Sequence, residues 1–466
     1  MNDSFSSIKH PVSTNHHDAR KTALIILNTL DKQRKTLDGV IKDVLVKDSP
    51  FSRKDQALLY ALIYGVLRWR GKLDWIIAQF SETRLDKIDP MVLNILRLGL
   101  FQIVFLNKVP TSAAVNTSVE MVKPMGQPWI VGYVNALLRN VVRGYKKIPF
   151  PDIEKDTVAA LSVNKSFPKW IIKRWLDRFG YKETVALCDS INSIPPITIR
   201  TNTLKTTCKK LKTNLKRDVE KIENTNYSTD GICFFNPKRS IPEMKTFKNG
   251  WFQVQDEGAQ LVTQLLNPRP GETVLDACSG LGGKTGHIAQ MMKNIGTIIA
   301  LDNHEKKLLS LESEMRRLGV SIVSTYTHDL NNPLNIEPLG MFDRILVDAP
   351  CSGLGVLRRN PDAKWFTSEN NLARYKEKQI KFLDNLAHIL KPSGVLVYSV
   401  CSTELEENEE VIKTFQNKHS EFIIDNNLVG FPPQIHSLIN KDGYLKTYPH
   451  INNMDGFFSV CFKRIK

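Results

Sequence analysis

The sequence predicts a multidomain protein with an all-α helical bundle at the front, a small α+β module in the middle, and a C-terminal α/β domain built on a mainly parallel sheet. Its 466 residues are too many for one compact core. Up to about residue 146 the apolar residues recur with a helical period. From residue 271 onward, strand-like and helix-like stretches alternate, as they do in doubly wound sheets.

The helical bundle is predicted for residues 18–146, after a polar lead-in at residues 1–17 that we expect to be disordered. Apolar residues between Leu37 and Leu45 are spaced i, i+3, i+4 and i+7, which places them on one buried helix face. A further helix should begin at Asp89 and Pro90, because an aspartate cap followed by proline in the first turn is a typical start signal.

The small α+β module is predicted for residues 160–250, after a linker that contains two prolines. Two short helices, FPKWIIKRWLDRFG and KETVALCDSIN, should precede an alternating strand at PPITIRT. A basic stretch, CKKLKTNLKRDVEK, follows the strand. The aromatic residues Trp170, Trp175 and Phe179 fit core positions better than platforms on which bases could stack.

The C-terminal α/β domain is predicted for residues 251–466. Four apolar stretches, ETVLDAC, GTIIALDN, FDRILVDAP and GVLVYSVCS, are typical of buried strands, and long amphipathic stretches between them predict helices. In a doubly wound sheet, ligands bind outside the carboxyl ends of the strands. Five residues with useful chemistry fall there: Asp276, Asp302, Asp348, Cys351 and Cys401. We therefore predict a single site at this edge of the sheet.

The positive charge is concentrated in the front half of the chain. Residues 1–150 carry 22 Lys and Arg against 12 Asp and Glu, residues 151–250 carry 19 against 11, and residues 251–466 carry 23 against 25. A basic front half joined to a nearly neutral back half predicts that the front half binds a polyanion such as nucleic acid. The alternative is charge that serves solubility alone.

The cysteines and the apolar stretches restrict the class of protein. Seven cysteines, scattered and without a CxxC pair, argue against a disulfide framework and a metal site, and favour the reducing cytoplasm. The longest apolar stretch, Met91–Leu106, is interrupted by polar residues and is too short for a membrane span. The first thirty residues lack the apolar core of a signal peptide. We expect a cytoplasmic monomer that binds no metal and no membrane.

The segment VLDACSGLGGKTGHIA at residues 274–289 has the pattern of a strand, a glycine-rich turn and the start of a helix. A phosphate-binding P-loop would need glycine at Cys278, and a dinucleotide fingerprint would need glycine at Thr285, so both fail by one residue. The remaining pattern is that of enzymes that bind S-adenosylmethionine, with Asp276 near the amino group of the methionine. Asp302, at the end of the next strand, would accept the ribose hydroxyls.

Two cysteines, Cys351 in VDAPCSG and Cys401 in YSVCST, end strands at the same predicted edge. Methylating C5 of a pyrimidine is difficult because that carbon is a poor nucleophile. A thiolate that adds to C6 makes an enamine that can attack a sulfonium methyl group, and a second thiol could assist release. Lys284 could favour the thiolate, and Asp348 could bind the ring nitrogen and amino edge of a cytosine. Four other cysteines are predicted to be small buried hydrophobes: Cys188, Cys208, Cys233 and Cys461.

Five segments together resemble the NOP2/Sun family of RNA 5-methylcytosine methyltransferases: DAPCSG, CST at residues 401–403, VQDEGAQL, VLDACSGLGGKTGHIA and the terminal DGFFSVCFKR. The helical front resembles the NusB RNA-binding fold, and the combination is similar to the bacterial members that methylate 16S ribosomal RNA. The resemblance covers residues 18–466. It implies a NusB-like RNA-binding domain, a middle RNA-binding module, and a Rossmann-like class I methyltransferase domain that uses S-adenosylmethionine.

The resemblance also implies roles for individual residues. Cys401 would be the nucleophile that attacks C6, Cys351 would assist product release, and Asp348 would contact the cytosine. Ser279 and Leu281 stand where the family usually has alanine and proline, which leaves the carboxylates and the glycines of the loop intact. The implied cofactor-binding residues are Cys278, Ser279, Gly280, Leu281, Gly282, Gly283, Lys284, Asp302, Asp329 and Asp348.

The substrate implied by the resemblance is one cytosine of 16S rRNA, free or in an early small-subunit particle, unstacked so that a thiol can reach its ring. One alternative is a non-catalytic NusB-like RNA-binding, transcription or assembly factor, but the intact acids and thiols argue against it. Another is a nicotinamide oxidoreductase, which fails at Thr285 and leaves both thiols unexplained. An rRNA cytosine-C5 methyltransferase that acts in ribosome biogenesis is the leading hypothesis.

Overall fold

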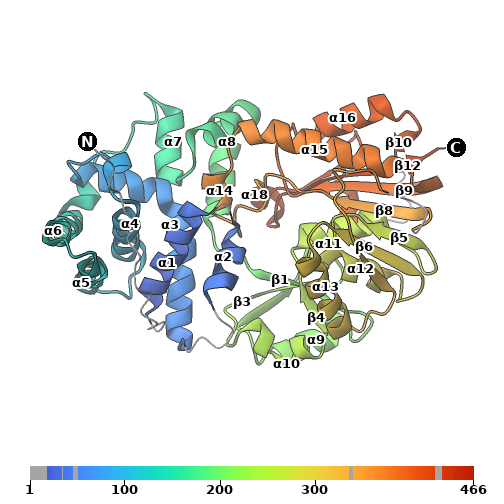
Figure 1. The fold of residues 1–466 in the computed structure, drawn as a ribbon, viewed down its shortest axis with the longest axis horizontal. Coiled ribbons are helices and arrows are strands. Elements are labelled where there is room, and N and C mark those ends of the chain that lie inside the picture. The colour runs from blue at the N-terminus through green and yellow to red at the C-terminus, as the bar shows by residue number, and fades with distance from the viewer. Residues whose placement is uncertain (1–17, 34, 46–50, 335–338, 426–432, 466) are drawn as a thin grey trace, which may run out of the picture. The chain divides into compact units, whose positions relative to one another are not determined.

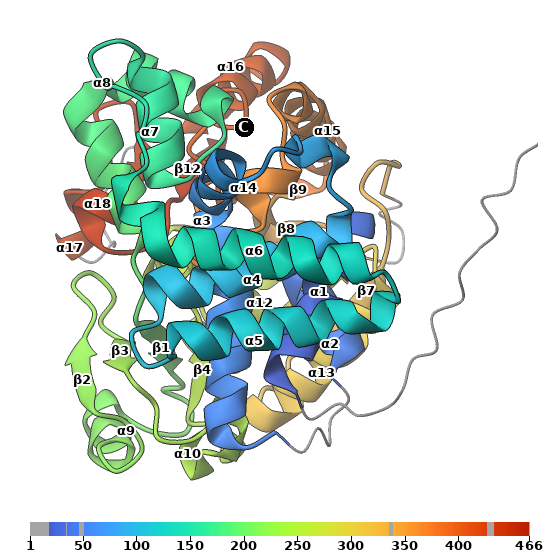
Figure 2. The ribbon, with the colours of Figure 1, turned by 90° about the vertical axis from the view of Figure 1, so that its left-hand side faces the viewer.

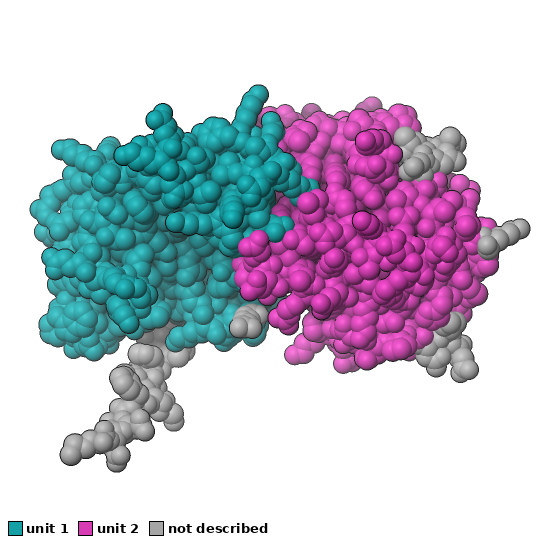
Figure 3. All heavy atoms as spheres, turned by 90° about the horizontal axis from the view of Figure 1, so that it is seen from above, with its two compact units in different colours: residues 1–185, 364–366 teal, residues 186–363, 367–466 magenta. Residues whose placement is uncertain are grey.

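The computed structural model describes residues 18–33, 35–45, 51–334, 339–425 and 433–465. The chain forms two compact units, which Figure 3 shows in different colours. One comprises residues 1–185 and 364–366, and the other comprises residues 186–363 and 367–466. The lead-in predicted at residues 1–17 lies outside the described residues. Figure 1 labels most of the helices and strands of both units.

The first unit contains the predicted helical bundle. In Figure 2, helices α5 and α6 lie side by side, and they pack on each other and on α4. Apolar residues from α1 to α6 form one buried core. The helices of this unit are α1 (Ala19–Lys32), α2 (Leu37–Val44), α3 (Arg53–Phe80), α4 (Pro90–Phe105), α5 (Thr111–Val122), α6 (Pro128–Gly144), α7 (Thr157–Lys165) and the first part of α8 (Lys169–Asn192).

Two of the predicted local signals are confirmed in this unit. Asp89 caps α4, because its Oδ1 accepts hydrogen bonds from the backbone N–H groups of Met91 and Val92 at 2.8 and 3.2 Å. Helix α8 is kinked at Gly180, whose φ of 75° is left-handed, so the helix consists of the two short segments that the sequence predicts. Of the three aromatic residues predicted for the core, Trp175 is buried, whereas Trp170 and Phe179 are only half-buried.

A four-stranded antiparallel sheet in the second unit contains the strands of the predicted α+β module, whereas residues 160–185, which we assigned to the same module, belong to the first unit. Its strand order is β2-β3-β1-β4, and Ile199 of β1 lies opposite Ile232 on one side and Val254 on the other. Strand β4 lies just beyond residue 250, where we expected the module to end. The elements are β1 (Ile197–Thr201), α9 (Cys208–Leu215), β2 (Lys221–Asn224), β3 (Gly231–Phe235), α10 (Lys245–Lys248) and β4 (Phe252–Val254).

In the described part of the chain, the main sheet has eight strands in the order β10-β12-β9-β8-β5-β6-β7, with β11 paired to β12. The strands from β9 to β7 in this order are parallel, and β12 is antiparallel to β9. The four predicted strands are β5, β6, β8 and β9. The bounds are β5 (Thr273–Asp276), β6 (Thr297–Asp302), β7 (Val323–Thr327), β8 (Phe342–Asp348), β9 (Leu390–Val400), β10 (Phe422–Ile424), β11 (Tyr444–Lys446) and β12 (Phe458–Arg464).

Helices cover both faces of the main sheet, as Figure 1 shows. Val274 and Leu346 pack on α11 (Glu257–Leu266), α12 (Gly283–Met291) and α13 (Glu305–Leu318). Their neighbours Leu275 and Ile345 pack on α15 (Asn370–Ala387) and α16 (Glu409–Lys418). Successive strand residues therefore enter opposite layers, which is the predicted doubly wound arrangement.

Several short helices complete the described chain. None of the helices in the described ranges combines the length and the apolar character needed to cross a bilayer. The short α-helices are α14 (Ala363–Phe366), α17 (Pro433–His436) and α18 (Pro449–Asn452), and single 3₁₀ turns lie at Leu85–Lys87, Lys123–Met125, Tyr145–Lys147 and Ile241–Glu243.

Candidate active site

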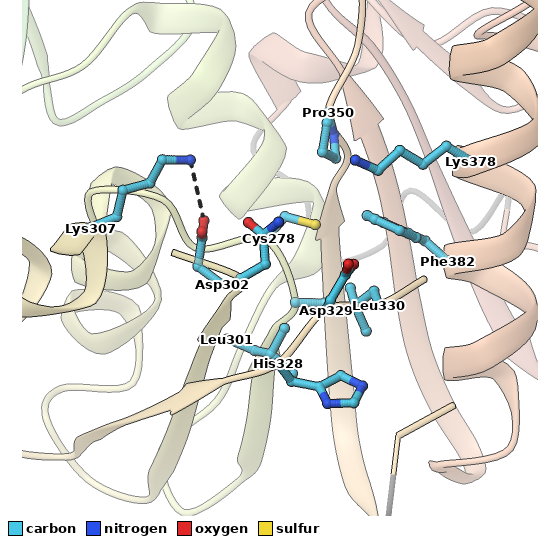
Figure 4. A pocket seen from close by; sticks show the side chains of 12 residues that line it. Cys278, Leu301, Asp302, Lys307, His328, Asp329, Leu330, Pro350, Lys378 and Phe382 are labelled. Atoms are coloured by element: carbon cyan, nitrogen blue, oxygen red, sulfur yellow. Dashed lines mark ion pairs between the residues drawn. The ribbon is translucent and has the colours of Figure 1, made fainter. Parts of the chain in front are cut away.

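The strand order places a hollow at the carboxyl ends of β5, β6 and β8. From β5 the chain proceeds outward to β6 and β7 on one side, and through β8 to β9 on the other, so the order reverses between β5 and β8. Ligands bind at such switch points. The hollow, shown in Figure 4, has about 350 Å³ of empty space, part of which is open to solvent and not enclosed by the protein. Its lining is Ala277, Cys278, Leu301, Asp302, Asn303, Lys307, His328, Asp329, Leu330, Pro350, Lys378 and Phe382.

The glycine loop after β5 has a backbone that requires glycine. Gly280 and Gly282 have φ angles of 56° and 86°, in the left-handed region. A Cβ on Gly282 would approach Leu311 Cγ to 2.7 Å, whereas a Cβ on Gly280 or Gly283 would meet nothing within 4 Å. The Ser279 N–H donates to the carbonyl oxygen of Leu301 at 2.9 Å. The loop is therefore folded onto the end of β6, and it leaves open space beside two of its glycines.

Two carboxylates predicted to bind the cofactor lie at neighbouring strand ends and line the hollow. Asp302 ends β6, and its Oδ2 accepts a hydrogen bond from the Gly280 N–H at 3.1 Å. The Lys307 ammonium lies 3.7 Å from the same oxygen, as the dashed line in Figure 4 shows. Asp329 follows β7 and lines the hollow from the next strand. Of the predicted loop, Cys278 belongs to the lining, whereas residues 279–284 do not, and Leu281 is 63 % exposed. Asp348, also predicted to bind the cofactor, lies outside the lining as well.

The sequence did not predict some of the residues that line the hollow. Lys378 and Phe382 come from α15, four residues apart, and Figure 4 shows both pointing into the hollow. A helical period identifies one face of α15, but it does not say which strand ends that face meets. Asn303 and His328 directly adjoin the two predicted carboxylates in sequence, and that adjacency was the available signal.

Asp276 differs from its expected position. It ends β5 but is 0 % exposed, and it does not belong to the lining of the hollow. The Thr285 hydroxyl donates to Asp276 Oδ2 at 2.6 Å. Burial raises the pKa of Asp276 to about 7, and the hydrogen bond from Thr285 opposes this effect. Asp276 thus supports the turn between β5 and α12 from the inside.

The two cysteines expected to share a site lie in contact. Cys351 follows β8, Cys401 follows β9, and their Sγ atoms are 3.2 Å apart. The hydrogen bond to Cys401 and burial together raise the pKa of Cys351 well above its ordinary range. Two thiols this close do not both ionise readily, because one negative charge opposes the other. Cys351 is therefore the partner that keeps its proton.

Lys284, in the first turn of α12, brings a positive charge to the same place. Its Nζ lies 2.6 Å from Asp348 Oδ2 and 5.4 Å from the centre of the Phe457 ring. Burial lowers the pKa of Lys284, but the charge and hydrogen bond of Asp348, with a contribution from Cys401, raise it above its ordinary value. The ammonium therefore stays protonated close to Asp348 and Cys401.

The residues that line the hollow fit S-adenosylmethionine. Asp302 and Asp329 offer carboxylate oxygens to hydroxyl and amino groups, while Leu330 and Phe382 offer an apolar wall to an aromatic base. The open space beside Gly280 allows a ligand to approach the backbone closely.

Comparison with known proteins decides the family. The probable ribosomal RNA small subunit methyltransferase B of Bacillus subtilis is 36 % identical to this chain over 448 residues, which cover 96 % of this chain and 98 % of that protein. The chain belongs to the RsmB/F family of 16S rRNA methyltransferases. A protein of the same description from Synechocystis is 33 % identical, over 96 % of this chain and 99 % of its own.

Three family models match successive parts of this RsmB/F-family protein. The model for 16S rRNA methyltransferase RsmB/F matches residues 263–463, the NusB family model matches residues 17–143, and a ferredoxin-like domain of RsmF/B-like methyltransferases matches residues 167–240. The predicted NusB-like front and methyltransferase back are thus confirmed. The protein is a methyltransferase that depends on S-adenosylmethionine.

Solved structures share the fold. The crystal structure of PH0851 matches 96 % of this chain and 99 % of its own, with a TM-score of 0.78 and 24 % identity. The structure of NSun6 from Pyrococcus horikoshii with SFG matches 65 % of this chain and 99 % of its own, with a TM-score of 0.56 and 24 % identity.

Proposed function

We propose that this protein transfers the methyl group of S-adenosylmethionine to C5 of one cytosine in 16S rRNA, through a covalent bond between Cys401 and C6 of the base. The observation that carries the proposal is the 3.2 Å contact between the sulfurs of Cys351 and Cys401. Pro350, next to Cys351, lines the hollow that fits the cofactor. One thiol suffices to activate the ring, and a second in contact with it suits an adduct that must also be resolved.

The proposed reaction begins when the Cys401 thiolate adds to C6 and opens the C5–C6 double bond. The electron pair at C5 then displaces the methyl group from the sulfonium, whose S–CH₃ bond breaks and leaves neutral S-adenosylhomocysteine. Water takes the proton from C5, the C–H electron pair forms the C5–C6 double bond again, and the C6–S bond breaks with its electron pair returning to Cys401. Each step needs the base to be unstacked, because the thiol approaches from above the plane of the ring.

The role that we propose for Cys351 follows from the fact that its thiol keeps a proton. The raised pKa of Cys351 keeps that thiol protonated, so Cys351 is suited to donate a hydrogen bond and not to attack the ring. The Lys284 ammonium stabilises a negative charge on Cys401, since the pKa of Lys284 is raised partly by Cys401. The S–H group of Cys351 can in turn donate a hydrogen bond to the Cys401 sulfur as it leaves C6. This is our basis for assigning product release to Cys351.

Asp348 is the proposed contact for the cytosine. Its Oδ2 is held by Lys284 at 2.6 Å, and its side chain remains 30 % exposed. A carboxylate can accept several hydrogen bonds. The exocyclic amino group of cytosine is a donor, whereas uracil has an acceptor at the same position. Asp348 would therefore favour cytosine over uracil.

The proposed RNA substrate is supported by the charge distribution and by the family. Residues 1–250 hold the positive excess of the chain, and they include the stretch that matches the NusB family. Contacts from Lys and Arg to phosphates would make binding weaken as salt rises. The matched relatives are named as methyltransferases of small-subunit ribosomal RNA. These names support 16S rRNA, free or in an early particle, as the target.

A direct test combines the purified protein with unmodified 16S rRNA, or with early small-subunit particles, and S-adenosylmethionine. Bisulfite sequencing of the product should show one new 5-methylcytosine, absent without the cofactor. Methylation at another atom or base would contradict the proposed C5 chemistry. A protein that binds RNA but gives no heat with S-adenosylmethionine in calorimetry would instead be the non-catalytic NusB-like factor.

A further inference from the structure

Both cysteine loops meet at one buried carboxylate, that of Glu407. Glu407 is 0 % exposed. Its Oε2 accepts hydrogen bonds from the Ser352 hydroxyl at 2.5 Å and from the Ser402 hydroxyl. Its Oε1 accepts from the backbone N–H of Ser352 at 2.8 Å and from Nε2 of Gln379 at 3.2 Å. One side chain therefore takes four hydrogen bonds from three separate segments.

The two serines stand next to the two cysteines. Ser352 directly follows Cys351, and Ser402 directly follows Cys401, although the cysteines are 50 positions apart in sequence. The serine Oγ atoms lie 3.2 Å from each other, as do the cysteine Sγ atoms. The carboxylate thus joins the two loops at the residue beside each sulfur.

Glu407 is itself held in place. The Tyr398 hydroxyl donates to the Glu407 backbone carbonyl at 2.7 Å, and Gln379 donates a second hydrogen bond to the carbonyl of Pro350 at 3.0 Å. Burial raises the pKa of Glu407 above its ordinary value, although the hydrogen bonds from the serines and Gln379 oppose this effect. Hydrogen bonds to an ionised carboxylate are short and strong, and a buried network of this kind is stable only when all its members are satisfied.

We propose that Glu407 is a positioning residue for methyl transfer, whose carboxylate holds the Cys351 and Cys401 loops together so that both sulfurs reach one pyrimidine. This inference rests on the proposed function in one respect, namely that the two thiols act in turn on the same base. Glu407 does not line the hollow, and it acts on the positions of the loops through its hydrogen bonds to Ser352 and Ser402. Its charge also contributes to the raised pKa of Cys351.

The variant Glu407→Gln removes the clamp with little change in shape. An amide has one acceptor oxygen and an NH₂ donor, so it cannot accept from all four partners at once. Misplacing reacting groups by about 1 Å can slow a reaction by about a hundredfold. We expect kcat to fall by roughly that factor while the affinity for S-adenosylmethionine stays within about twofold. A merely structural role would change cofactor affinity and folding together with kcat.

The matched control is Glu410→Gln. Glu410 lies three positions further on, in α16, where its half-exposed side chain pairs with Lys376 at 2.7 Å. This variant changes the charge by the same amount and should keep the rate of the unmodified protein. Single-turnover methylation of 16S rRNA and calorimetry with S-adenosylmethionine, run on both variants, separate the kinetic effect from cofactor binding.

A second readout does not depend on methylation. The oxidant diamide takes two electrons and two protons from a pair of thiols, which form one S–S bond while diamide becomes the hydrazine. Mass spectrometry of the peptides that contain Cys351 and Cys401 measures the rate of this cross-link. We expect rapid cross-linking in the unmodified protein and in Glu410→Gln, and cross-linking slower by about tenfold in Glu407→Gln because the loops separate.

The outcomes distinguish the two proposals. Glu407→Gln that methylates and cross-links at the rates of the unmodified protein would overturn the positioning role. A Glu407-dependent cross-link in a protein that makes no 5-methylcytosine would uphold the clamp but reject the proposed function. If Glu407→Gln fails to fold, Ser402→Ala removes one of the four hydrogen bonds, and unchanged rates in that variant would also overturn the inference.

Discussion

Arg200 in β1 donates a hydrogen bond of 2.9 Å to the carbonyl oxygen of Gly283, the first residue of α12. This hydrogen bond joins the α+β module, which contains β1, to the glycine loop that precedes α12. Arg200 is 1 % exposed, and its guanidinium also donates to Gln253 at 2.8 Å and to Gln290 at 3.2 Å. The module therefore does more than supply basic surface, because it holds the end of the glycine loop in place.

Replacing Arg200 by alanine should destabilise the protein and weaken cofactor binding. The change leaves several buried acceptors without a donor, which costs about 3 kcal/mol. Denaturant unfolding measures this loss, and calorimetry measures the affinity for S-adenosylmethionine. Arg217→Ala, at an exposed position of the same module, is the control and should leave both values unchanged. Equal stability of the two variants would show that the buried network contributes little.

Cys401→Ala should abolish methyl transfer, because it removes the proposed nucleophile and the neighbouring thiol, Cys351, keeps its proton. We expect the rate with labelled S-adenosylmethionine to fall by at least about a thousandfold, as it does when a nucleophile is removed. Binding of the cofactor should persist. Cys233→Ser, at a half-buried position in β3, should remain active. An active Cys401→Ala variant would refute the assignment of the nucleophile.

Cys351→Ala should trap the reaction after methyl transfer. Without the neighbouring S–H group, the Cys401 sulfur is a poorer leaving group, so the methylated base stays bound to the protein. Denaturing gels should then show a protein–RNA band that carries the label of the methyl group. The double variant that also lacks Cys401 should show no such band. Free turnover by Cys351→Ala would remove the proposed role in product release.

Asp276→Asn should change how stability depends on pH. The pKa of Asp276 is about 7 in the folded protein, above its ordinary value of 3.8. At a pH between these two values, the folded protein therefore keeps a proton on Asp276 that the unfolded chain has lost. The wild-type protein therefore loses stability as pH rises through this range, by up to about 4 kcal/mol, and the loss is complete above about pH 7. Asp276→Asn has no carboxyl group at this position, so its stability does not fall with pH for this reason. Urea unfolding at about pH 5 and about pH 8 should show the variant gaining on the wild type at the higher pH.

Asp343→Asn provides a control of opposite sign. Burial alone would raise the pKa of Asp343, but hydrogen bonds from Lys391 and from the Thr273 N–H lower it overall. A lowered pKa stabilises the folded protein above the ordinary pKa, and the contribution disappears as pH falls through the folded value. Asp343→Asn should therefore lose stability relative to the wild type at neutral pH. A parallel response of both variants would contradict the assignment for Asp276.

The sequence predicts this site well where chemistry coincides with strand ends. Buried parallel strands are short apolar runs, so their carboxyl ends can be located, and Asp302, Cys351 and Cys401 fall there. The contact between the two sulfurs follows from the pairing of β8 with β9. A sequence in which strands and helices alternate predicts this pairing, because strands that follow one another in such a chain usually lie side by side in the sheet.

The residues that the sequence does not predict act across elements. Glu407, Phe382 and Arg200 each lie outside the glycine and cysteine motifs. Glu407 reads as one of several acidic residues at the start of a helix, and only the fold shows that it is buried beneath two loops. Strand β12 was missed for a related reason, since its antiparallel pairing with β9 breaks the alternation of strands and helices.

The backbone at Gly282 has an implication for how such enzymes can vary. Its left-handed φ suits glycine, and the side chain of Leu311 on α13 occupies the place of any Cβ. A side chain at position 282 would strain this backbone and push the turn away from α13. A chain that has lost this glycine while keeping a bulky neighbour on α13 should have given up the donor molecule altogether.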